Sequence, residues 1–169
     1  MSAKDFGNKR KNAFLENLPT ISLESGEIVE RCKFNFSFFD KTQSCGQDFQ
    51  DWSHNELIKL MDKMKNYSGS SLEYWRHQRV GGGGLKVFEI YGDFPKKSNF
   101  THPKHVPHDV SWARFRLENL VRLVRLVGFI VPKGFKCAES IALQQPYDSN
   151  TFYVVFLDRD HKFYITEEP

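Results

Sequence analysis

The residues of this sequence best suited to chemistry are a histidine, a tyrosine and two arginines in its C-terminal half. His161 and Tyr164 follow an apolar run, while Arg114 and Arg116 lie two positions apart and would share one face of a strand. Cleavage of RNA without a metal requires a proton acceptor, a proton donor and cations that stabilise the charged transition state. Because His, Tyr and Arg can fill these roles, the sequence predicts a catalytic set of His161, Tyr164, Arg114 and Arg116.

A purely structural interpretation of the same residues remains open. His161 would then be a turn residue that bonds Asp158 or Asp160, and Tyr164 would pack at the edge of a sheet. If the chain continues as a strand after the turn, His161 and Tyr164 have opposite phases. They share a face only if the turn extends through His161.

Two metal-dependent alternatives also remain open. A long loop carries three imidazoles and a carboxylate that suit zinc, namely His102, His105, His108 and Asp109. The prolines between them favour an extended backbone that would separate the side chains. Three carboxylates near the C-terminus suit magnesium: Glu139, Asp158 and Asp160. Neither set has the spacing of a known metal motif, so we expect no metal and no other cofactor.

The distribution of charge points to a polyanionic partner. The net charge is only +3, but residues 70–136 hold 12 Lys or Arg and 5 Asp or Glu, a balance of +7. Four arginines of this section are candidates for binding nucleic acid: Arg76, Arg79, Arg122 and Arg125. Gly81 to Gly84 lead into an expected strand, whereas a phosphate-binding loop leads into a helix, so a hinge is the better interpretation.

The apolar periodicity predicts an α+β fold of one domain, with a mainly antiparallel twisted sheet of about five strands and two helices on one face. Strands are expected at residues 28–39, 85–91 and 151–157, and a hairpin at 110–131 is preferred over a helix. Helices are expected at 54–66, after a capping box formed by Ser53 and Glu56, and at 72–78. The loop of residues 92–109 should lie over an end of the sheet.

The N-terminal residues and the cysteines set the wider context. Residues 1–12 are basic and predict a flexible arm, with a helical turn at 13–18 that docks on a domain spanning residues 13–169. Three cysteines without a close pair favour reduced thiols, and no apolar segment is long enough to span a membrane. We therefore expect a cytoplasmic protein.

Several of these segments together carry a family resemblance. The segments Phe-Asn-Phe-Ser-Phe at 34–38, Trp-Ala-Arg-Phe-Arg at 112–116, Val-Gly-Phe-Ile at 127–130 and the closing residues 152–164 resemble a family of small uncharacterised proteins of bacteria and their mobile elements. In that family an Arg-Val-x-Gly-Phe segment precedes a closing Phe-Tyr-x-Val-x-x-Leu-Asp-x-x-His-x-x-Tyr. The outline is also similar to the mRNA-cleaving toxins of toxin–antitoxin modules, which is an analogy at the level of fold.

The leading hypothesis is an RNA-acting effector of a mobile genetic element or a bacterial defence system, resembling a metal-independent ribonuclease toxin. Its expected partners are RNA or DNA and a cognate protein, such as an antitoxin or a defence-complex subunit. The alternative is a non-catalytic module that binds nucleic acid or a protein through residues 70–136.

Overall fold

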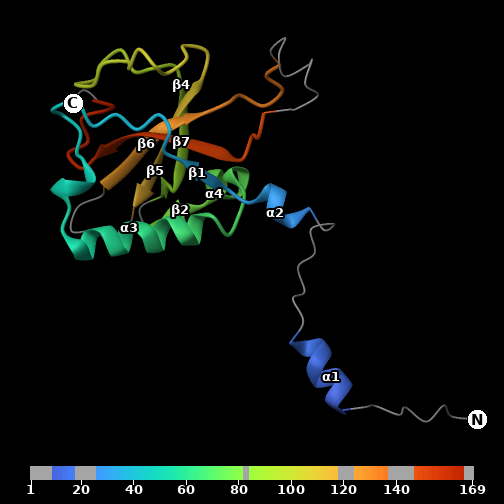
Figure 1. The fold of residues 1–169 in the computed structure, drawn as a ribbon. Helices are drawn as coiled ribbons and strands as arrows, with labels where there is room; N and C mark the ends of the chain where they lie inside the picture. Colours follow the sequence, from blue (N-terminus) through green and yellow to red (C-terminus); the bar gives the residue numbers. More distant parts are fainter. Residues whose placement is uncertain (1–8, 18–25, 82–83, 118–123, 137–146, 166–169) are drawn as a thin grey trace, which may run out of the picture.

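The fold is built on a five-stranded sheet in the order β1-β7-β6-β5-β4 (Figure 1). The computed structural model describes residues 9–17, 26–81, 84–117, 124–136 and 147–165. The strands of this sheet are β1 (Lys33–Asn35), β4 (Phe88–Gly92), β5 (Ser111–Leu117), β6 (Val124–Ile130) and β7 (Thr151–Asp158). All neighbours pair antiparallel except β1, which runs parallel to β7 at one edge. The predicted α+β fold with a mainly antiparallel sheet is confirmed.

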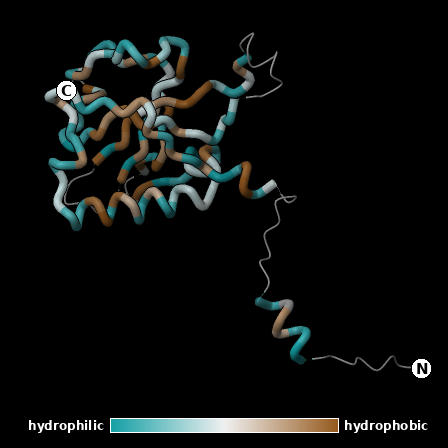
Figure 2. The backbone as a smooth tube through the Cα atoms, in the orientation of Figure 1, coloured by the Kyte–Doolittle hydropathy of each residue, from teal (hydrophilic) through white to brown (hydrophobic). Residues whose placement is uncertain are grey.

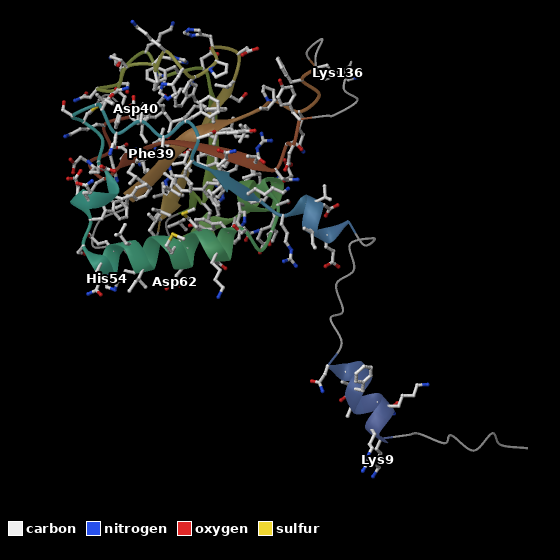
Figure 3. All side chains as sticks on the ribbon, in the orientation of Figure 1. Lys9, Phe39, Asp40, His54, Asp62 and Lys136 are labelled. Carbon is white, nitrogen blue, oxygen red and sulfur yellow. The ribbon has the colours of Figure 1, made fainter. Side chains whose placement is uncertain are left out.

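One face of the sheet, the helix face, is covered by α3 (His54–Tyr67) and α4 (Leu72–His77). The predicted capping box begins α3: the Ser53 amide donates to the Glu56 carboxylate at 2.8 Å, and the Glu56 amide donates to the Ser53 hydroxyl at 3.3 Å. Leu60, Met64 and Tyr67 are the buried residues of this helix. Met61 is exposed, because the buried stripe of the helix runs along Leu60, Met64 and Tyr67. In Figure 3, the labelled His54 and Asp62 mark the outer surface of α3.

The opposite face, the loop face, is covered by residues 93–110 and by the C-terminal residues 161–165. Phe100, Val106 and Phe163 pack there against Trp112 and Phe156. The Asn99 amide donates to the Lys162 carbonyl at 3.0 Å, and the Ile165 amide donates to the Lys97 carbonyl at 3.3 Å. The histidine-containing loop therefore lies over a face of the sheet, where it fills a second core, and the expectation that it lies over an end is corrected.

The expected strand at residues 28–39 is mostly wrong. Only Lys33–Asn35 form a strand, and a short helix, α2 (Glu27–Glu30), precedes it. Phe34 and Phe36 pack in the core under the helices, whereas Phe38 packs on the loop face. The phenylalanines of this segment thus enter two different cores, which a single strand with one buried face could not achieve. Figure 2 shows hydrophobic stretches of the chain gathered along the strands at the centre of the molecule.

The other elements are short. A 3-10 turn, η2 (Phe49–Asp51), precedes α3, and β2 (Arg79–Val80) pairs with β3 (Leu85–Lys86) around the glycine run. Gly84 has a φ of 75° and leads into a strand, so no helix follows this run. The predicted hairpin is present as β5 and β6. The predicted strand after Asp158 is absent from the described residues, which continue to 165 without one.

The N-terminal helix α1 (Lys9–Glu16) begins inside the segment that we expected to be an arm, and it lies apart from the sheet (Figure 1). Phe14 is exposed, so the expected docking of this turn is not seen. Residues 1–8 lie outside the described part of the chain, and the predicted flexible arm stays a prediction. None of the described helices has the length and hydropathy needed to cross a membrane.

Candidate functional site

Three arginines of neighbouring strands point to the loop face of the sheet. On β5, Ala113, Phe115 and Leu117 pack under the helices, so the alternate residues Arg114 and Arg116 face the other way. Arg116 lies directly opposite Arg125 on β6 in the hairpin register. Arg114, Arg116 and Arg125 form what we call the arginine cluster.

Glu89 on β4 holds two of these arginines. Its Oε2 atom accepts from Arg114 Nε at 3.1 Å, from Arg114 Nη2 at 2.6 Å and from Arg116 Nη2 at 2.9 Å. Arg116 also donates through Nη1 to the Lys86 carbonyl. Burial opposes ionisation of Glu89, but the bonds and charges of Arg114 and Arg116 outweigh it and lower the pKa of this carboxyl. Arg114 and Arg116 are only 8% and 5% exposed, so both are fixed in place.

The positive charge of Arg125 is not neutralised in the way that the charges of Arg114 and Arg116 are. Its Nη2 donates to the Nδ1 atom of His161 at 3.1 Å, and its Nε is buried without a hydrogen-bond partner. Asp158 is its register partner on β7, yet no ion pair to a carboxylate is found for Arg125 within the described residues. Burial, followed by the neighbouring charge of Arg114, lowers the pKa of the Arg125 guanidinium.

The carboxylate of Asp158 binds backbone amides of the turn that follows β7. It is 0% exposed and accepts from the amides of Lys162 at 2.8 Å and Phe163 at 3.1 Å. His161 takes a left-handed backbone conformation with φ 61°, which is unusual for a residue other than glycine. The turn therefore extends through His161, and the phase conflict between His161 and Tyr164 does not arise.

The bond from Arg125 determines how the His161 ring can act. A guanidinium has only N–H donors, so Nδ1 of His161 must accept, and in the neutral ring Nε2 then carries the proton. The ring is thereby oriented by a neighbouring cation, in the way that a third residue orients a catalytic histidine. The neutral ring can therefore donate a hydrogen bond from Nε2, and Nδ1 can accept a proton only when Arg125 binds another acceptor.

Tyr164 is held through a stack of rings. Its ring lies 4.9 Å from that of Tyr91 with an interplanar angle of 2°, and the Arg114 guanidinium lies 5.0 Å from the Tyr91 centroid. Such a cation–π contact fixes the orientation of the ring. The hydroxyl of Tyr91 is buried without a hydrogen-bond partner, and burial raises its pKa. Tyr164 itself is partly exposed at the outer end of the stack.

The structure thus brings the four predicted catalytic residues to one region of the loop face. His161 reaches the cluster through Arg125, and Tyr164 reaches it through Tyr91. The arginines that were predicted to bind nucleic acid do not all lie in this region. Arg125 belongs to this region, whereas Arg76 and Arg79 lie at α4 and β2, where Arg76 faces Glu73 at 3.9 Å and Arg79 donates to the Gly84 carbonyl at 2.9 Å. Arg122 lies outside the described residues.

The zinc alternative does not form a cluster. The rings of His102 and His108 stack at 4.3 Å, but His105 lies apart from them and bonds the Phe38 carbonyl at 3.2 Å. Burial, followed by the neighbouring His108, lowers the pKa of His102. Among the described residues, no group of three or more His, Cys, Asp or Glu side chains is arranged to hold a metal ion, and this includes Asp109.

The magnesium alternative also loses its ligands. Both oxygens of Asp158 accept from backbone amides, and the Asp160 carboxylate lies 3.3 Å from Lys162 Nζ. Glu139 lies outside the described residues. Two acidic side chains engaged in this way do not present a site for a hard cation.

Two residues of the site, Glu89 and Tyr91, were missed by the sequence reasoning. Their spacing on a strand places them on one face, so alternation on β4 was a usable signal. The pairing of Arg116 with Arg125 was also missed, because a turn at residues 118–119 would pair Arg116 with Val121 instead. Register depends on the length of the turn, which the sequence did not reveal.

No protein-family model matches this chain, and no curated protein or solved structure is significantly similar to it.

Proposed function

We propose that this protein binds the phosphate backbone of RNA at the arginine cluster and cleaves it there without a metal. The observation that carries the proposal is an excess of positive charge on a covered sheet face. Among the described residues, the three arginines face two carboxylates, Glu89 and Asp158, and Arg125 forms no ion pair. A partly buried cation without a counter-ion is costly unless an anion occupies the site when the protein functions.

The chemistry assigns different tasks to the residues around Arg125. In the reaction, the 2′ oxygen of RNA bonds to phosphorus and the bond from phosphorus to the 5′ oxygen breaks. One proton leaves the 2′-hydroxyl and another reaches the 5′ oxygen. When the phosphate replaces His161 as the acceptor of Arg125, Nδ1 of His161 accepts the proton of the 2′-hydroxyl and Tyr164 donates a proton to the 5′ oxygen, while Arg125 stabilises the negative charge on the phosphate. Arg114 and Arg116, which are committed to Glu89, contribute charge and position.

The setting of this activity is proposed from the resemblance of the C-terminal segment. An effector of a mobile genetic element or a bacterial defence system, acting in the cytoplasm and controlled by a cognate protein, is consistent with it. The competing function is a non-catalytic module that binds nucleic acid or a protein through residues 70–136, for which Arg76 and Arg79 would be the main contacts with nucleic acid.

The test uses the purified full-length protein and a labelled single-stranded RNA in the presence of a chelator. We expect cleavage that leaves a 2′,3′-cyclic phosphate. His161→Ala should slow cleavage by roughly 100-fold or more while leaving RNA affinity within about threefold. Arg125→Gln should weaken both binding and cleavage.

Matched variants separate the two functions. Lys65→Gln on the exposed side of α3 also removes one positive charge and should change neither property. If the protein binds RNA without cutting it, and if Arg76→Gln and Arg79→Gln weaken binding where Arg125→Gln does not, the non-catalytic module is the correct function. RNA that stays both intact and unbound at low salt would rule out the proposal.

A further inference from the structure

The loop face carries a second feature, a pocket of about 580 Å³ that is lined mainly by aromatic and apolar side chains. This volume lies within the range of pockets that bind small molecules. We call it the aromatic pocket. The described residues of its lining are five aromatic rings, four other apolar side chains and one carboxylate: Phe38, Phe129, Phe135, Tyr147, Tyr153, Pro107, Val110, Val131, Pro132 and Asp109.

The five rings form two separate groups. Phe129 on β6 and Tyr153 on β7 stack at 4.8 Å with an interplanar angle of 9°, and Phe38 meets both edge-on. Phe135 and Tyr147 meet each other edge-on at 5.5 Å. No ring contact joins the first group to the second in the described part of the chain, although both line the same hollow. Two ring-bearing walls with a space between them suit a flat aromatic ligand.

Among the lining residues that the structure describes, Asp109 is the only charged one, and its carboxylate limits the kinds of ligand that the pocket can bind. A carboxylate only accepts hydrogen bonds when ionised, so it selects a ring that carries N–H donors. Basic residues flank Phe135 on the segment after β6, at Lys133 and Lys136, the latter labelled in Figure 3. A flat ring with amino donors that is attached to an anionic backbone describes an unstacked nucleobase.

We propose that the aromatic pocket binds one unstacked base of a single-stranded nucleic acid, and that guanine fits it best. Guanine offers two adjacent N–H donors on one edge, and a single carboxylate can accept both. A quaternary ammonium ion also suits aromatic rings with a carboxylate. The volume and the two separate walls favour a flat ring over such a compact cation.

This inference rests on the proposed function for its substrate class, but it concerns a different site. Phe129 and Arg125 lie four residues apart on β6, which places them roughly 13 Å apart along the strand. The base of a mononucleotide therefore tests the aromatic pocket alone, whereas an oligonucleotide can occupy the pocket and the arginine cluster together.

The experiment measures binding of guanosine, uridine and choline to the full-length protein by calorimetry and by ligand-detected NMR. We expect guanosine to bind better than uridine, and choline not to compete. Tyr147→Ala and Phe135→Ala should each weaken guanosine binding roughly tenfold. Both rings lie on the outer wall, and Tyr147 is 43% exposed, so the core should persist. Tyr74→Ala on α4, at 48% exposure, is the matched control and should have no effect.

Asp109→Asn tests the selection of the base, because an amide cannot accept both donors of guanine and should reduce the preference over uridine. Absence of guanosine binding at millimolar concentration, or choline binding that displaces it, would overturn the inference. So would guanosine binding that is unchanged in Tyr147→Ala. Arg125→Gln should leave guanosine binding intact while weakening RNA, so failure of the pocket and failure of the arginine cluster give different results.

Discussion

Arg125 differs from the other two arginines of the cluster in how its charge is balanced. Arg114 and Arg116 each donate to Glu89, while Arg125 donates only to a histidine ring and keeps a buried Nε without a partner. Binding sites often keep charged residues that function requires even though they lower the stability of the fold. The same residue should therefore be important for RNA and unimportant for folding.

Arg125→Met is expected to leave the free energy of unfolding within about 0.5 kcal/mol of the original protein, or to raise it by about 1 kcal/mol, because it removes a cation without a counter-ion. Arg116→Met should instead destabilise by about 1–2 kcal/mol, since it leaves the Lys86 carbonyl and part of Glu89 without a donor. Urea denaturation of the two variants measures the difference. A loss above about 2 kcal/mol in Arg125→Met would identify Arg125 as structural.

The lowered pKa of Glu89 predicts how the stability of the protein depends on pH. Its folded pKa is lowered from the ordinary value of 4.5, so its contribution to stability is fully present above that value and is lost as pH falls through the folded pKa. Glu89→Gln should cost about 2 kcal/mol at neutral pH, because two largely buried arginines lose their counter-charge. The stability gap between the two proteins should narrow as the pH falls below the ordinary pKa of 4.5 and through the lowered pKa of the folded state. A gap that stays constant across this range would contradict the assignment.

At the level of secondary structure, the sequence of β6 is restricted at Gly128, where the backbone of β7 comes very close. A Cβ atom on Gly128 would lie 1.9 Å from the Tyr153 carbonyl oxygen, and the pairing of β6 with β7 shifts register next to this glycine. Backbone atoms of a central strand cannot move aside cheaply. Only glycine fits at this position, and the irregular pairing brings Phe129 and Tyr153 opposite each other in the aromatic pocket.

Gly128→Ala should therefore destabilise the protein by about 3 kcal/mol or more, or prevent folding. Gly46→Ala is a milder control, because its Cβ would be crowded only by a side-chain atom, in the ring of Phe100 at 3.0 Å, while the carbonyl oxygens of Gln43 and Leu157 lie at an ordinary contact distance of 3.6 Å. Thermal unfolding followed by circular dichroism compares the two. A Gly128→Ala protein as stable as Gly46→Ala would show that the strands can separate at this point.

Periodicity in the sequence predicted the elements whose pattern is local. The alternation on β5 indicated that Arg114 and Arg116 share a face, and the capping box located the start of α3. The same alternation gave a wrong prediction for the phenylalanines at 34–38. Alternate residues of a strand share one face, but Phe36 and Phe38 enter different cores. That division depends on which layers cover the sheet, which is a property of the tertiary structure.

Only part of the candidate site could be predicted from the sequence, because some of its contacts also depend on tertiary structure. His161, Tyr164, Arg114 and Arg116 were chosen by residue type, and their types are visible in the sequence. Glu89 and the pairing of Arg116 with Arg125 depend on strand register across two connections. The sequence also suggested a second strand after Asp158, which the bonds from the Lys162 and Phe163 amides replace with a turn.

At the scale of the whole molecule, the small net charge conceals an uneven field. The total is +3, while residues 70–136 carry a balance of +7 and contain the whole arginine cluster. RNA that binds this section should release counter-ions, so its affinity should fall as salt is added. The steepness of that fall reports how many phosphates are neutralised.

If one single-stranded RNA contacts about three cations of this section, the logarithm of the association constant should fall against the logarithm of salt concentration with a slope of about −2. Arg125→Gln should reduce the magnitude of the slope by about 0.7, because one phosphate contact is lost. Lys65→Gln, which removes an equal charge from the opposite side of the molecule, should leave both the affinity and the slope unchanged. Fluorescence anisotropy from 50 to 300 mM salt gives all three slopes. An equal change of slope in both variants would mean that RNA responds to total charge, and the arginine cluster would then have no special part in binding it.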